Sequence, residues 1–194
     1  MIEKNIIKKN LKEYLIQSYI TRYLPKASYS KIELKKTPLG EKIIVHTARP
    51  GLVVGRKGEN ITRLTNFLRA NFNMENPQIE ILEIANPNLD PQSVAERIVS
   101  NFEKYGAKRF KSIGYRALQS VMDAGATGAE VVISGRGVPS SRSKSWRFIA
   151  GHLKKSGDIS ENHTKRALVV AELKSGAIGI KVNIGKDLVG DMPF

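Results

Sequence analysis

The chain has 194 residues, of which 41% are hydrophobic and none is cysteine, and its 32 lysines and arginines against 18 acidic residues give a formal net charge of +14. This composition is typical of a folded protein, and the length allows one large domain or two small ones. The lack of cysteine excludes disulfides, Cys-ligated zinc and thiol catalysis, and it favours a reducing, cytoplasmic compartment. So large a charge favours a polyanionic partner. Because no apolar run approaches the ~20 residues that span a bilayer, we expect nucleic acid rather than a membrane.

The first part of the chain predicts a helix, two strands, a second helix and a third strand. Residues 3–24 have an amphipathic pattern that Pro25 ends, and its predicted apolar stripe is Ile6, Ile7, Leu11, Leu15 and Ile20. Residues 31–36 and 42–48 alternate as strands do, and the Thr-Pro-Leu-Gly sequence at 37–40 predicts a hairpin turn between them. Residues 78–84 predict the third strand.

A glycine pair stands between the second strand and the second helix. Gly55 and Gly58 enclose Arg56 and Lys57, and apolar residues then recur at helical spacing to about Asn71. Two glycines three apart allow a sharp turn and a close approach of the backbone, and the amide groups of a helix N-terminus suit a phosphate. The sequence therefore predicts a phosphate-binding loop. An ordinary helical corner with solvated cations is the alternative.

The second part of the chain predicts two helices followed by about four strands. Asp90 and Pro91 are placed as the cap and the first residue of a helix that Gly106 ends. A further helix over about 107–124 has an apolar stripe of Phe110, Ile113, Ala117, Leu118 and Val121, and its polar side carries Lys108, Arg109, Lys111 and Arg116. Strands are predicted at 129–134 and 144–152, and a hairpin at 166–173 and 177–184. The expected fold is α+β, with an N-terminal domain at 1–86, a C-terminal domain at 87–185 and a tail at 186–194.

The Gly/Ser-rich segment 135–144 is predicted to be a loop that follows a phosphate backbone. The expected RNA contacts are three cations of this segment, Arg136, Arg142 and Lys144, and Arg147 in the strand that follows. Trp146 and Phe148 could stack on bases, but their alternate spacing favours burial in the core of the sheet.

No pattern indicates catalysis. His46, His152 and His163 are far apart and lack metal-ligand spacing. Neither a Walker-type phosphate loop nor the GxGxxG pattern is present, and the acidic residues are scattered singly. We therefore expect no catalytic residue, no metal and no cofactor.

Val54 to Ile61 resembles the K-homology (KH) RNA-binding motif, an aliphatic residue followed by GxxGxxI. The predicted order of elements is that of the type II KH domain, a family in which helices pack on a three-stranded mixed sheet. In this family a short helix, here at about 50–54, precedes the loop, and the loop clamps a few nucleotides by their backbone.

A longer resemblance covers nearly the whole chain. Gly51–Leu64, the dodecamer Gly125–Arg136 and Gly176–Val182 resemble segments of the small-subunit ribosomal protein S3 (uS3) family. Residues 140–158 resemble its archaeal and eukaryotic branch, and the lack of a long C-terminal extension favours the archaeal type. The resemblance implies a structural protein in the head of the small subunit, which binds small-subunit rRNA and neighbouring head proteins near the mRNA entry channel.

In bacterial members of this family, a basic cluster on the second helix of the second domain is credited with unwinding mRNA. By position, Lys111 keeps its charge here, but Ser112 and Tyr115 stand where bacterial relatives have cations. Two other classes stay open: a KH protein that acts outside the ribosome, and an enzyme that acts on nucleic acid.

Overall fold

The computed structural model describes residues 2–23, 29–37, 40–72, 74, 77–136, 142–174 and 176–185. The tip of the predicted turn at 37–40, residues 137–141 of the predicted basic loop and the predicted tail at 186–194 lie outside these ranges. The chain divides into two compact units, Met1–Ala85 and Asn86–Phe194.

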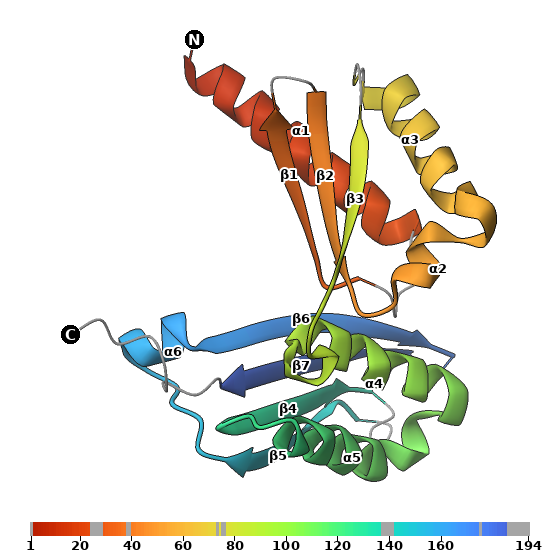
Figure 1. The fold of residues 1–194 in the computed structure, drawn as a ribbon. Helices are drawn as coiled ribbons and strands as arrows, with labels where there is room; N and C mark the ends of the chain where they lie inside the picture. Colours follow the sequence, from red (N-terminus) through yellow and green to blue (C-terminus); the bar gives the residue numbers. More distant parts are fainter. Residues whose placement is uncertain are drawn as a thin grey trace. The chain divides into compact units, whose positions relative to one another are not determined.

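The N-terminal unit is built on a three-stranded mixed sheet, as predicted (Figure 1). Strand β1 (Lys31–Thr37) pairs antiparallel with β2 (Gly40–Thr47), and β2 pairs parallel with β3 (Gln78–Glu83). The central strand buries Ile43, Ile44 and Val45, as the apolar run in its sequence requires.

Three α-helices accompany this sheet: α1 (Ile2–Tyr23), α2 (Pro50–Val54) and α3 (Glu59–Phe72). The last two confirm the short helix and the following helix expected around the glycine pair. Ile16 and Ile20 of α1 share a core with Leu64 and Leu68 of α3. The rings of Tyr19 and Phe67 stack with centroids 3.7 Å apart, which joins the two helices.

The apolar stripe predicted for α1 is mostly wrong. Ile6, Ile7, Leu11 and Leu15 are 53%, 65%, 57% and 46% exposed, and only Ile20 of the predicted stripe is buried. Ile16 is the other buried residue among those of α1 whose burial the structure describes. At 100° per residue, Ile7 and Leu11 lie on the side of the helix opposite Ile16 and Ile20. The helix is therefore apolar on two sides, and the sheet covers only one.

The C-terminal unit is a four-stranded antiparallel sheet with the order β5-β4-β7-β6. Its strands are β4 (Gly128–Gly135), β5 (Lys144–Gly151), β6 (Thr164–Leu173) and β7 (Gly176–Gly185). Helices α4 (Pro91–Tyr105) and α5 (Phe110–Asp123) cover one face of this sheet (Figure 1). A short helix α6 (Asp158–Asn162) precedes β6. Asp90 caps α4 as predicted, because its Oδ2 accepts from the Ser93 amide at 2.8 Å.

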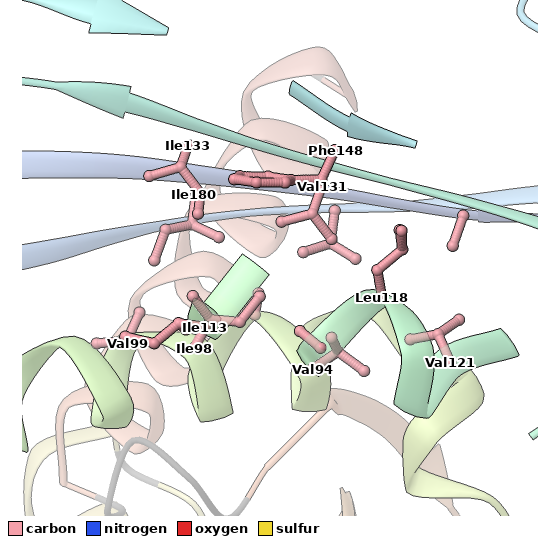
Figure 2. Packing of buried hydrophobic residues seen from close by; sticks show 14 of the residues in the cluster. Val94, Ile98, Val99, Ile113, Leu118, Val121, Val131, Ile133, Phe148 and Ile180 are labelled. Carbon is pink, nitrogen blue, oxygen red and sulfur yellow. The ribbon is translucent and has the colours of Figure 1, made fainter. Parts of the chain in front are cut away.

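The core lies between the two helices and the sheet. In Figure 2, Val131, Ile133 and Ile180 of the strands face Ile98 and Ile113 of the helices. The apolar stripe predicted for the helix at about 107–124, which is α5, is confirmed, because all five of its residues are buried. Phe148 is buried and Trp146 half-buried against the core, which confirms that both aromatics belong to the packed side of β5.

Side chains at alternate positions of the same strands point to the sheet's other face, here called the outer face. Glu130, Arg147, Arg166, Lys181 and Asn183 fall on it by this alternation. The two cations of β5, Lys144 and Arg147, therefore lie on opposite faces of the sheet.

Candidate nucleic-acid interface

The glycine loop joins α2 to α3 through backbone conformations that L side chains rarely adopt. Gly55 has φ +73° and Gly58 has φ +77°, and Arg56–Gly58 form a single 3₁₀ turn between them. A Cβ at Gly55 would lie 2.7 Å from Asn60 Nδ2. That amide nitrogen donates to the Leu52 carbonyl at 3.2 Å, which ties the first turn of α3 to α2. The glycine at 55 thus makes room for the contact that shapes the loop.

Both cations of the loop reach solvent. Arg56 and Lys57 are exposed, and only Gly58 separates them from Glu59, the first residue of α3. Glu59 in the first turn would repel a phosphate, but its carboxylate pairs with Arg63 one turn further along the helix. The loop therefore offers two cations and a helix N-terminus at one place, which is the arrangement that binds backbone phosphate.

A second group of predicted residues lies on α5 and the turn before it. Lys108, Arg109, Lys111 and Arg116 are all exposed there. The Arg109 guanidinium lies 5.8 Å from the centre of the Tyr105 ring, and the Lys111 ammonium 5.0 Å from that of Trp146. Both distances are within cation–π range, so the aromatic rings help to position these charges while leaving them exposed.

The residues predicted around the 135–144 loop do not all lie together. Gly135 and Lys144 are paired across β4 and β5, so Arg136 and Lys144 lie at the same end of this hairpin, and both are exposed. By alternation Lys144 falls on the helix-covered side, with Trp146. Arg147 falls on the outer face, where its guanidinium pairs with Glu130.

Sequence reasoning missed the basic residues that accompany Arg147 on that outer face. Lys154, Lys155, Arg166 and Lys181 line the same hollow as Arg147. The alternation of side chains along β6 and β7 was the sequence signal that could have placed Arg166 and Lys181 on the exposed side of their strands. The pairing of strands from distant parts of the sequence, which no local pattern reveals, brings them together.

The described parts of the chain hold no group of three histidine, aspartate or glutamate residues that could bind a metal ion. Among the helices that the structure describes, none has the length and apolar character needed to cross a membrane.

Each unit matches a known domain. The KH domain model matches residues 15–89, and the model of the C-terminal domain of ribosomal protein S3 matches residues 102–184. The fold and the glycine loop therefore define a two-domain protein in which a KH domain precedes an S3-type C-terminal domain.

Curated relatives match both domains together. The small ribosomal subunit protein uS3 of Methanocaldococcus jannaschii is 39% identical over 184 residues, 95% of this chain and 87% of the relative. The protein of the same name from Methanococcus maripaludis is 37% identical over 186 residues, 96% of this chain and 87% of the relative. That of Methanosphaera stadtmanae is 36% identical over 184 residues, 95% of this chain and 72% of the relative.

The chain belongs to the uS3 family of small ribosomal subunit proteins. These three relatives are archaeal, which agrees with the archaeal type predicted from the sequence. The family consists of ribosomal structural proteins rather than enzymes.

Proposed function

We propose that the chain is a structural constituent of the small ribosomal subunit and binds small-subunit rRNA. The observation that carries this proposal is the match of both domains, over 95% of the chain, to relatives named for that subunit. A KH protein acting outside the ribosome would need only the first domain to match. The formal net charge of +14 supports a polyanionic partner.

The proposed mechanism requires no chemical step. The exposed Arg56 and Lys57 and the amide groups at the start of α3 bind backbone phosphates. On the C-terminal unit, phosphates are bound by Lys108, Arg109, Lys111 and Arg116, and also by Arg136, Arg142 and Lys144 at the end of the β4–β5 hairpin. Phosphate contacts of this kind supply affinity, while RNA shape and neighbouring proteins supply specificity.

We place the protein in the head of the subunit near the mRNA entry channel, where α5 would contact mRNA. The exposed cations of α5 support this placement. Its strand-separating role is reduced relative to a fully basic helix, because Ser112 is neutral and the Tyr115 ring packs edge-on against Phe148 with centroids 5.0 Å apart. We therefore propose that α5 contacts RNA, and we do not propose that it unwinds mRNA.

Neighbouring head proteins are the other proposed partners, and the free side of α1 supports them. Ile7, Leu11 and Tyr14 are 65%, 57% and 68% exposed and recur at helical spacing. Lys4 and Lys8 are also exposed on this helix. An amphipathic segment of a neighbouring protein with acidic residues at its edge would match this surface in both polarity and charge.

Sedimentation of a native cell extract through a sucrose gradient tests the proposal. We expect the chain to travel with the small subunit at near one copy each and to remain there through a moderate salt wash. Recovery at the top of the gradient would contradict the ribosomal assignment and favour a free RNA-binding protein.

A further inference from the structure

A basic hollow of about 360 Å³ lies on the outer face of the C-terminal sheet. Five cations line it: Arg147, Lys154, Lys155, Arg166 and Lys181. Among the described residues that line it, Glu130 is the single acidic one. This volume suits a small ligand or one unit of a polymer, and the excess of four positive charges selects an anion.

Strand register places the side chains of the hollow in two adjacent rows. In the first row, Arg147 and Lys181 flank Val132 on either side, because both strands pair with β4 at that residue. In the second row, Glu130 pairs with Asn183, and Asn183 pairs with Arg166. A regular sheet thus holds the cations at fixed spacing, which is more precise than a loop would allow.

Glu130 neutralises only part of this charge. Its side chain is 7% exposed, and it interacts with Arg147 and, at 3.4 Å, with the Lys155 ammonium. Arg166 is held differently, since its Nη2 donates to the Ser160 hydroxyl at 2.7 Å. Lys154 and Lys181 are exposed and have no hydrogen-bond or ion-pair partner within the described ranges. These two ammonium groups are available to a ligand.

Asn183 adds one polar atom, Oδ1, that has no partner among the described residues. The residue is 8% exposed, and its Nδ2 donates to Glu130 Oε2 at 3.1 Å. Since an ionised carboxylate can only accept hydrogen bonds, this contact fixes the orientation of the amide. The Asn183 Oδ1 atom is then buried with no donor among the described residues. A buried acceptor without a partner is costly. Because Asn183 lines the hollow, a ligand bound there that approaches Oδ1 closely enough to donate a hydrogen bond would remove this cost.

We infer that this hollow is a second RNA site, in which Lys154, Lys181 and Arg166 contact backbone phosphate and Asn183 Oδ1 accepts from a ribose 2′-hydroxyl or a base amino group. RNA carries a phosphate and a 2′-hydroxyl in every nucleotide, and the 2′-hydroxyl is a donor that DNA lacks. Acidic side chains of a protein offer acceptors for the cations but no donor for Asn183. The inference rests on the proposed rRNA-binding function and adds a site to it.

The test compares two charge reversals on neighbouring strands of one sheet. Lys181→Glu lies in the hollow, whereas Lys165→Glu changes an exposed lysine at the start of β6 that alternation places on the helix-covered side. Binding of the full chain to purified archaeal small-subunit rRNA is measured by filter binding over a range of salt concentrations. Circular dichroism melts verify that each variant folds.

We expect Lys181→Glu to weaken binding about fivefold at ~0.15 M salt and to lower the slope of log K against log salt by about one, as the loss of one phosphate contact requires. Lys165→Glu is expected to stay within about twofold of the unchanged protein, because screening limits its influence at a distance. If Lys181→Glu does not fold, Lys154→Glu takes its place, since Lys154 lies between elements.

Equal binding by the two variants would overturn this site and leave the rRNA-binding function intact, because the unchanged protein still binds. A failure of the unchanged protein to bind rRNA would overturn both. Normal rRNA binding by Lys181→Glu, together with its loss from sedimenting small subunits, would assign the hollow to an acidic protein and overturn the RNA site.

Discussion

Lys57 is the non-glycine residue with positive φ among those that the structure describes, at +52°. A left-handed conformation costs an L residue about 1 kcal/mol, and glycine would adopt it without that cost. Such strain at an exposed loop indicates that the side chain is needed where it is. The geometry therefore favours binding rather than stability as the reason for a lysine at this position.

Replacing Lys57 with glycine separates these two effects. We expect Lys57→Gly to leave the free energy of unfolding unchanged or raise it by up to ~1 kcal/mol, because the backbone strain is relieved. Affinity for small-subunit rRNA falls about fivefold at ~0.15 M salt, because one phosphate contact is lost. Thermal melts and filter binding measure the two quantities. Unchanged affinity would show that Lys57 is a solvated charge.

At the scale of elements, α5 lies close to β5 at Gly114. A Cβ on this residue would lie 2.7 Å from the Phe148 ring, far inside van der Waals contact. Glycine in a helix normally costs about 0.5–1 kcal/mol relative to alanine. Close packing of the helix on the sheet, with Phe148 buried between them, accounts for a glycine at this point.

We expect Gly114→Ala to destabilise the protein by about 1–2 kcal/mol, because the overpacking penalty exceeds the gain in helix propensity. Gly51→Ala in α2 is the matched control, since a Cβ there meets nothing within 4 Å. This control should be neutral or slightly stabilising in urea unfolding. A stabilising effect of Gly114→Ala would mean that the Phe148 ring can move aside.

The side of α1 that packs on its sheet is tested by two adjacent residues. Ile16 is 1% exposed and Leu15 is 46% exposed. Ile16→Ala should cost about 2–5 kcal/mol through lost burial and the cavity left behind, whereas Leu15→Ala should cost less than about 1 kcal/mol. Denaturant unfolding of the two variants decides the matter. Equal losses would restore the stripe that the sequence predicted.

For the whole molecule, the large positive charge governs how RNA binding responds to salt. We expect log K for small-subunit rRNA to fall linearly with log salt, by about 0.7–0.9 for each phosphate neutralised. Replacing Arg56 and Lys57 together by aspartate should lower that slope by about two. Aspartate tolerates the left-handed conformation at position 57 better than most residues, so the domain should still fold.

Filter binding over about 0.05–0.5 M salt measures this slope, and circular dichroism melts report the fold. The control variant replaces Lys35 and Lys36 of β1 with aspartate. It changes the net charge by the same amount, at positions outside the proposed contacts. Collapse of the melting transition, or a slope like that of this control, would contradict a phosphate-binding role for the glycine loop.

The sequence alone was sufficient for features that are encoded within a few residues. The glycine loop, the cap at Asp90, the stripe of α5 and the burial of Phe148 all follow from local spacing and residue type, and the structure agrees with them. Positive charge also pointed to a polyanion before any fold was known.

Tertiary structure alone decided which surfaces these elements share. Periodicity shows that a helix has an apolar side, but α1 has two, and only packing determined that Ile16 and Ile20 are the buried ones. Alternation shows that Arg147 and Lys181 each face one side of a strand, but not that both strands pair with β4 at Val132. Lateral pairing joins residues far apart in the chain, and for that physical reason the basic hollow could be found only in the folded protein.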